Sequence, residues 1–221
     1  MGKLFSDKAS VILRNMLANT DKNWVARDFE ISKTRSAEVL AILRKHGFIS
    51  GISRGRTACS NLINREALLE EWTKWYNFER NKYFYYYSPD KKVLEKLKKY
   101  FNEKKLFNKY GLTLHTGANL ITNYVSSDII YLYLDAEIFE ELSLDIRQTL
   151  DFKKLGTGGN ICFIKSFYKK SVFINKQIIK GFSVVSNLQL YLDLYGYPQQ
   201  RGREHAKYLF NILKEKGEPV V

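Results

Sequence analysis

The sequence predicts an α+β protein with two domains, a helical one over residues 1–80 and a mixed α/β one over residues 81–221. At about 100 to 200 residues per domain, a chain of 221 residues has room for two. Apolar residues follow the helical period through the first domain, whereas apolar runs of strand length recur in the second. Hydrophobic residues make up 45% and charged residues 27%, which is typical of packed globular domains rather than disordered chains.

Three helices are predicted at the start of the chain. Ser6 can cap a helix whose apolar positions recur every three to four residues and which ends near Thr20. A short second helix covers residues 24–30, and Ser32 caps a third over residues 33–46. Gly47 supplies the left-handed residue that ends the third helix.

A hairpin and a connecting helix complete the first domain. Two β-prone runs, 48–53 and 58–63, are joined by Arg-Gly-Arg-Thr, which predicts a hairpin with a cationic tip. The connecting helix covers residues 64–81, and its aromatic residues indicate core packing or contacts in a homodimer. Three short helices followed by a hairpin is the order of a winged helix-turn-helix domain, whose third helix enters the major groove of DNA.

The exposed start of the third helix supplies candidate base contacts. Arg35 could pair with guanine, and Glu38 could accept a hydrogen bond from cytosine. Thr34 could contact a thymine methyl group or a phosphate, and Lys33 a phosphate.

The hairpin tip supplies candidate phosphate contacts. Arg54 and Arg56 flank a glycine there, and both would hold the DNA backbone. The alternative is that these charges only solvate a protein-interaction module, since winged helices also serve as dimerisation elements. An interaction module has no special need for two arginines at a hairpin tip, which favours DNA.

The second domain should be built around a mixed sheet. Ser88, Pro89 and Asp90 predict a helix start, residues 111–125 a strand, a turn and a helix, and residues 129–137 a strand buried on both faces near the centre of the sheet. Three further strands and two closing helices are expected over residues 160–168, 171–175, 182–186, 187–196 and 200–215.

The charge indicates a polyanionic partner. The net charge is +13, and a net −5 over residues 111–150 lies between basic blocks on either side, so distinct surfaces are expected. Nucleic acid is favoured over an anionic membrane, and no apolar run approaches the roughly 18 residues of a membrane span. The two cysteines, Cys59 and Cys162, match no metal or disulfide pattern, and we expect a cytoplasmic protein without a cofactor.

One carboxylate pair keeps an enzyme reading open. Asp135 and Glu137, two residues apart at a strand end, should point to the same side and could hold a divalent metal, as in nucleotidyltransferases. The expected Gly-Ser phosphate loop is represented only by TGAN at 116–119, and no third carboxylate follows. LGTGGN at 155–160 lacks the lysine of a P-loop and is better read as a turn.

Asp193 is expected to need a partner. It lies among leucines on an apolar helix, and a buried carboxylate is costly unless it is paired. Arg201 or Arg203 could return to it across the corner at residues 196–198 and form a charge-assisted pair.

Three stretches together resemble the AbiEi antitoxin family of type IV toxin-antitoxin systems. They are KTRSAEVLAILRKHGFI, a TG followed by YLYLD, and the terminal SNLQLYLDLYGYPQQRGREHAKYL. The terminal stretch, with Asp193 and then Arg201, Arg203 and Glu204, is the best marker. The resemblance implies a regulator that binds its own promoter DNA, and a C-terminal domain that opposes a toxin of nucleotidyltransferase type.

The expected function is therefore that of a DNA-binding transcriptional regulator without catalysis of its own. The first alternative is a metal-dependent nucleotidyltransferase or nuclease that uses Asp135 and Glu137. The second is an RNA-binding module, because lysines and tyrosines can bind single strands by charge and stacking.

Overall fold

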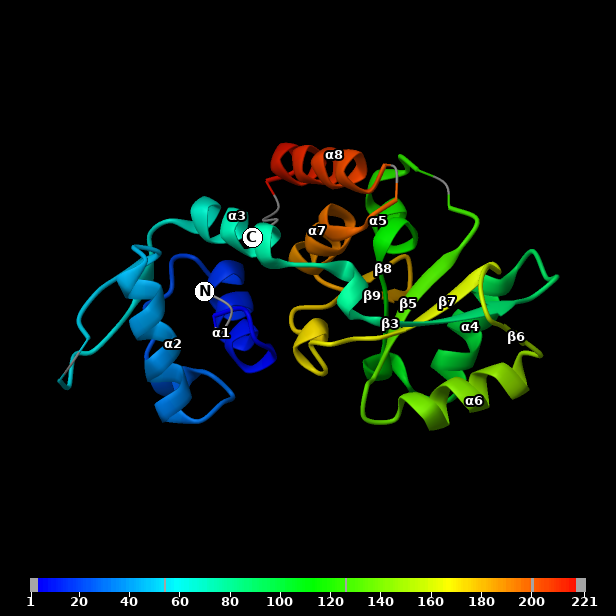
Figure 1. Ribbon diagram of the computed structural model, residues 1–221, viewed down its shortest axis with the longest axis horizontal. Coiled ribbons are helices and arrows are strands. Elements are labelled where there is room, and N and C mark those ends of the chain that lie inside the picture. The colour runs from blue at the N-terminus through cyan, green and yellow to red at the C-terminus, as the bar shows by residue number, and fades with distance from the viewer. Residues whose placement is uncertain (1–3, 54, 126, 200, 218–221) are drawn as a thin grey trace. The chain divides into compact units, whose positions relative to one another are not determined.

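The computed structural model describes residues 4–53, 55–125, 127–199 and 201–217 (Figure 1). The chain divides into two compact units, one up to Tyr76 and the other from Asn77 onward. Each unit buries its own set of apolar side chains. The helices and the large mixed sheet of the second unit confirm the predicted α+β class.

The first unit begins with two helices separated by a turn. They are α1 (Asp7–Ala18) and α2 (Lys33–Lys45). The helix predicted over residues 24–30 is wrong, because only a 3-10 turn at Ala26–Asp28 forms there. Trp24 is instead extended and exchanges two backbone hydrogen bonds with Ser60, at 2.9 and 2.7 Å, so it pairs with the hairpin.

Both ends of α2 follow the sequence prediction. The Ser32 hydroxyl accepts a hydrogen bond from the amide of Arg35 at 3.3 Å and so caps the helix. Gly47 has a φ of +72°, and the amide of Phe48 donates to the carbonyl of Leu43 at 3.0 Å. This hydrogen bond, together with the positive φ of Gly47, is typical of a Schellman C-cap, which needs a residue that tolerates positive φ.

The predicted hairpin is present with short strands. β1 (Ile49–Ser50) and β2 (Asn61–Leu62) pair antiparallel, with Ile49 opposite Leu62. Gly51 follows β1 with a φ of +109°, and a Cβ added there would lie 2.4 Å from the carbonyl oxygen of Cys59. The hairpin therefore requires glycine at this position.

The connecting helix is shorter than predicted. α3 (Arg65–Trp75) ends at Trp75, because Tyr76 is extended, and a separate 3-10 turn follows at Phe78–Arg80. Trp72 is fully buried and stacks on Phe5 with 5.9 Å between ring centroids. These aromatics therefore form part of the core of the first unit.

Among the described residues, seven strands form the sheet of the second unit, in the order β6-β3-β7-β5-β4-β9-β8. β5 is the middle strand, pairing parallel with β7 and antiparallel with β4, as its apolar sequence predicted. The strands are β3 (Lys82–Tyr87), β4 (Tyr110–Leu112), β5 (Ile130–Leu134), β6 (Lys153–Leu155), β7 (Ile161–Lys165), β8 (Gln177–Ile179) and β9 (Phe182–Val184).

Helices cover the two faces of this sheet. Figure 1 shows α5, α7 and α8 on one side and α4 and α6 on the other. Their bounds are α4 (Val93–Glu103), α5 (Leu114–Thr122), α6 (Phe139–Thr149), α7 (Asn187–Gly196) and α8 (Gly202–Glu215). α7 and the start of α8 form the corner that contains the terminal sequence stretch.

Two predicted elements of this unit need correction. Residues 171–175 are not a strand but contain a 3-10 turn at Ser171–Phe173, whose amides bond to carbonyls three residues earlier instead of to a neighbouring strand. The helix expected from Pro89 starts at Val93, because the Ser88 and Asp90 side chains accept the amides of Asp90 and Lys92 in a preceding turn.

Candidate functional site

The N-terminal half of α2 presents polar side chains to solvent. Lys33, Thr34 and Glu38 are exposed, whereas Val39 and Leu43 on the opposite face are fully buried. The residues predicted to read DNA on this helix therefore share one accessible edge.

Two of those residues contact each other. Nη1 of Arg35 lies 2.9 Å from Oε2 of Glu38, and Nη2 lies 3.4 Å from the Ser6 hydroxyl. The side chains of Arg35 and Glu38 are 25% and 55% exposed, so the ion pair contributes at most about 1 kcal/mol. A base contact by Arg35 or by Glu38 therefore requires that this ion pair be broken first. The sequence prediction treated the two residues as independent.

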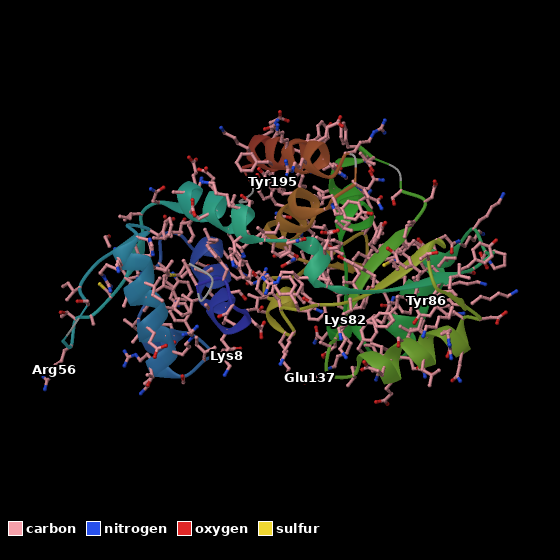
Figure 2. The ribbon with its side chains drawn as sticks, viewed as in Figure 1. Lys8, Arg56, Lys82, Tyr86, Glu137 and Tyr195 are labelled. Carbon is pink, nitrogen blue, oxygen red and sulfur yellow. The ribbon has the colours of Figure 1, made fainter. Side chains whose placement is uncertain are left out.

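The hairpin tip lies close in sequence to this edge. Arg56 is exposed, and Figure 2 shows it at the far end of the hairpin loop. Arg54 lies outside the described residues. Gly55 between them has a φ of +92°, with nothing within 4 Å of an added Cβ.

A groove of about 510 Å³ separates α2 from the hairpin. Ala37 and Ala41 of α2 form part of one wall, and Ile52 and Cys59 part of the other. Arg44, which also lines the groove, donates from Nη2 to the hydroxyl of Ser60, the residue before β2, at 2.8 Å and so ties α2 to the hairpin. The small alanines permit close approach to the exposed edge of the helix.

Asp135 and Glu137 do not form a shared pair. β5 ends at Leu134, so the alternation of a strand no longer applies to these two residues. Asp135 accepts hydrogen bonds from Nζ of Lys109 at 2.8 Å and from the amide of Glu137 at 3.0 Å. Glu137 forms an ion pair with Lys170 at 2.9 Å. Each carboxylate is therefore held by its own lysine.

The pKa of Asp135 reflects this arrangement. Burial opposes ionisation, but the hydrogen bonds from Lys109 and the Glu137 amide outweigh it and lower the pKa below its usual value. Within the described ranges, no group of three or more His, Cys, Asp or Glu side chains is placed to hold a metal.

The glycine-containing segments also have definite places. TGAN at 116–119 lies inside α5 rather than in a loop. A Cβ on Gly117 would lie 2.8 Å from the carbonyl oxygen of Leu112 and 2.9 Å from the Leu190 side chain, so the glycine allows α5 to pack closely. In LGTGGN at 155–160, Leu155 ends β6, and the residues after it form the predicted turn that leads to β7.

Asp193 is the centre of a buried polar network. Asp193 is fully buried. Its carboxylate accepts hydrogen bonds from the Tyr133 hydroxyl at 3.0 Å, from the Gln189 amide at 2.6 Å and from the Thr113 hydroxyl. Asn81 extends the network by donating to the Tyr133 hydroxyl at 3.3 Å. The network connects α7 to β5 and to the start of α5.

The predicted arginine partner of Asp193 is wrong. Arg203 lies over the ring of Tyr195, with 5.3 Å from Cζ to the centroid, and Arg201 is exposed with a φ of +74° at the start of α8. Glu204 accepts a hydrogen bond from the Tyr124 hydroxyl. Neutral donors satisfy the buried carboxylate, so these charged residues of the terminal stretch lie at the surface.

Two histidines that are far apart in the sequence meet in the same unit. Nδ1 of His115 and Nδ1 of His205 are 2.9 Å apart, and Nε2 of His205 lies 2.9 Å from the Thr122 hydroxyl. Burial lowers the pKa of His115, and burial together with His115 lowers the pKa of His205 to about 4. One neutral ring therefore donates to the other. The sequence carried no signal for this pair.

The cysteines are free thiols, as expected. Burial raises the pKa of Cys162 to about 12, so its thiol is unreactive near neutral pH. In the part of the chain that the structure describes, no helix is both long enough and apolar enough to cross a membrane.

Comparison with known proteins identifies one family. Residues 61–214 match the family described as transcriptional regulator, AbiEi antitoxin, type IV TA system. The match includes the buried network and the terminal stretch, whereas α1, α2 and β1 precede it. No curated protein and no solved structure matches the chain significantly.

Proposed function

The chain belongs to the AbiEi antitoxin family of type IV toxin-antitoxin systems, and from this membership we propose that it is a DNA-binding regulator that represses its own operon. The family description supports the role of transcriptional regulator. Binding to the promoter and the contacts described below are the steps that we add.

The proposed DNA-binding domain is a winged helix-turn-helix formed by the first unit. The order α1, 3-10 turn, α2 and hairpin supports it, and so does the bridge between Trp24 and Ser60, which adds an extended residue beside β2. In such a domain α2 enters the major groove. The observation that carries the proposal is the exposed polar start of α2 next to a hairpin with a basic tip.

The roles of individual residues follow from this placement. Arg35 and Glu38 would exchange their mutual ion pair for base edges, and Thr34 lies on the same exposed edge. Lys33 and the hairpin arginines Arg54 and Arg56 would bind phosphates, which position the protein without reading sequence.

The second unit is proposed to oppose a toxin of nucleotidyltransferase type. Family membership implies a toxin partner in the system. The exposed residues Arg201, Arg203 and Glu204 at the start of α8 are our candidates for the surface that acts on it. The antitoxin of a type IV pair need not bind its toxin, so the surface could act on a shared target.

We further propose that the chain has no catalytic activity. Asp135 and Glu137 support this, because each forms an ion pair with a separate lysine. The Asp135 carboxylate also accepts the amide of Glu137 and so stabilises the turn after β5. Calorimetry with magnesium or manganese tests it. No heat of binding is expected, and a divalent-dependent nucleotidyl transfer that is lost in Asp135→Asn would overturn it.

A reporter gene placed behind the DNA upstream of this gene tests the regulator. Expression of the chain should lower reporter output, and Lys33→Ala combined with Arg56→Ala should restore it. Lys207→Ala, an exposed lysine on α8, serves as the control and should repress like the parent. Reporter output that is unchanged by the parent would refute autoregulation.

A further inference from the structure

We propose that the face of the sheet at β3 and β6 is a binding surface for single-stranded nucleic acid, separate from the proposed duplex-binding surface of the first unit. The surface is built on Tyr85 and Tyr87, which we call the tyrosine row. Tyr83 lies on the same side of β3 but packs on Phe78, with 5.6 Å between ring centroids, and donates its hydroxyl to the Phe78 carbonyl. The inference goes beyond the proposed regulator and does not depend on it.

The pairing of strands shows that the tyrosine row lies on one face. Alternate residues of a strand point to the same side, and directly paired residues share that side. Tyr85 is opposite Cys162 of β7 and Leu155 of β6, and Tyr87 is opposite Lys153. Leu155 and Lys153 therefore lie beside the tyrosines on the same face.

The other face of β3 is filled by packing. Phe84 lies 4.8 Å from Phe139 of α6, and Tyr86 lies 4.6 Å from Phe163, measured between ring centroids. Figure 2 labels Tyr86 and Lys82 on this strand. The even-numbered aromatics thus belong to the core beneath α6, which leaves the odd-numbered ones for the opposite side.

The tyrosine row becomes more exposed toward β6 and toward the end of β3. In the cross-strand row of Tyr85, Cys162 is fully buried, Tyr85 is half-buried and Leu155 is 37% exposed. Tyr87 is 43% exposed. The helices on this side, α5, α7 and α8, pack on one another (Figure 1). α5 packs on β4 and β5, and α7 packs on the 3-10 turn at Phe78–Arg80 that precedes β3.

The chemistry of this surface fits a single strand better than a duplex. Tyrosines two residues apart along a strand are spaced by about 6.8 Å, a step that one nucleotide of an extended strand can follow. Aromatic rings on an open sheet stack with unpaired bases, and every base offers a π-face. In a duplex these faces are covered by base pairing and stacking.

The charge of the two strands is complementary to a phosphate backbone. Lys153 lies beside Tyr87 on this face, and neither β3 nor β6 contains a carboxylate. Lys82 and Lys154 belong to the opposite face, with Phe84 and Tyr86. Lys91 and Lys92, both exposed, follow β3 within five residues of Tyr87. A hydrophobic protein partner would not require this concentration of lysine, whereas a polyanion does.

Titration of a fluorescent 12-nucleotide oligouridine with the full chain tests the proposal. Tyr85→Leu and Tyr87→Leu keep an apolar side chain but remove the ring, so each should weaken binding roughly tenfold to a hundredfold. Tyr85→Phe and Tyr87→Phe keep the ring and should bind within about twofold of the parent. Tyr124→Leu, a 38% exposed tyrosine after α5, is the matched control and should bind like the parent.

The same titration with a duplex separates this surface from the proposed DNA-binding unit. The leucine variants should bind duplex DNA normally, and Lys33→Ala with Arg56→Ala should leave oligouridine binding within about twofold. Ultraviolet crosslinking should place uridine adducts on the peptide that contains the tyrosine row. A parent that does not bind oligouridine, or leucine variants that bind it as the parent does, would overturn the proposal; the latter is also the result expected of a protein-docking surface.

Discussion

At the scale of single residues, Asp193 is the side chain on which the second unit depends most. Its carboxylate is fully buried and receives hydrogen bonds from three elements through Thr113, Tyr133 and Gln189. Hydrogen bonds to a charged acceptor are stronger than neutral ones, and donors left unsatisfied in a core are costly. The residue therefore has a structural role.

Asp193→Ala should lower the free energy of unfolding by roughly 3 kcal/mol or more, since each buried donor left unsatisfied costs about 1 to 3 kcal/mol. Urea denaturation followed by near-ultraviolet circular dichroism measures this, because every tyrosine except Tyr76 lies in the second unit. The three tryptophans lie in the first unit, so their fluorescence provides an internal reference. Asp128→Ala, at an exposed position, is the control, and equal losses in both variants would rule out the buried network.

The His115–His205 pair makes stability depend on pH. The pKa of His205 is about 4 in the folded state, compared with about 6.5 for an unperturbed histidine. Between these values the unfolded chain binds a proton that the folded chain does not, so stability is full above pH 6.5 and falls as the pH drops toward 4.

The loss should reach roughly 2 to 3 kcal/mol at pH 4. His205→Gln should flatten this part of the profile of unfolding free energy against pH. His46→Gln, at an exposed position after α2, should leave the slope unchanged. A parent profile that is flat between pH 6.5 and 4 would show that the pair titrates normally.

These two sites show how far residue-level prediction reached. The leucines around Asp193 correctly indicated a buried carboxylate. The partner was assigned to the nearest arginines in sequence, but the structure supplies neutral donors from Thr113 and Tyr133, 80 and 60 residues away. His115 and His205, 90 residues apart, were not connected at all. Such partners depend on the topology of the sheet, which local patterns do not contain.

At the scale of elements, the hairpin of the first unit depends on one glycine. Gly51→Ala would force a Cβ to 2.4 Å from a backbone oxygen at a φ of +109°. It should destabilise the first unit by roughly 2 kcal/mol or more, since both a steric clash and a strained backbone result.

Gly55 provides the matched comparison for the hairpin. It also has a positive φ, but an added Cβ has nothing within 4 Å. Gly55→Ala should therefore cost only about 1 kcal/mol. Thermal unfolding monitored by tryptophan fluorescence measures both variants, and equal melting temperatures would contradict the hairpin geometry.

Helices were predicted better than strands. Apolar periodicity located α1 and α2, and Ser32 marked the start of α2, because these signals are local. Ser6 precedes α1 but forms no side-chain cap hydrogen bond. Helices were also predicted within 111–125 and 187–196, where α5 and α7 lie, whereas α6 was missed. β3 was missed, because a run of adjacent aromatic residues shows no alternation until the sheet distinguishes its two faces. The short strands β6 and β8 were also missed, and Trp24 was assigned to a helix because its partner Ser60 is 36 residues away.

At the scale of the whole molecule, charge and organisation suit a regulator that contacts DNA. The net charge of +13 provides long-range attraction to a polyanion. The first unit has the polar helix edge and the hairpin, whereas the second has the sheet and the buried network. The matched family covers all of the second unit up to residue 214 and only the end of the first. Sequence-specific DNA binding by the first unit is therefore the proposal that most needs a direct measurement.

Fluorescence anisotropy with the upstream duplex and a scrambled duplex of equal length provides that measurement. The parent should bind the upstream duplex more tightly, with affinity that falls steeply as salt rises, because phosphate contacts release counterions. Arg56→Ala should weaken both duplexes alike, whereas Arg35→Ala should reduce the preference between them by roughly 1 to 3 kcal/mol, the contribution of one bidentate base contact. Equal affinity of the parent for the two duplexes, or unchanged binding in both variants, would show that α2 and the hairpin do not read the operator.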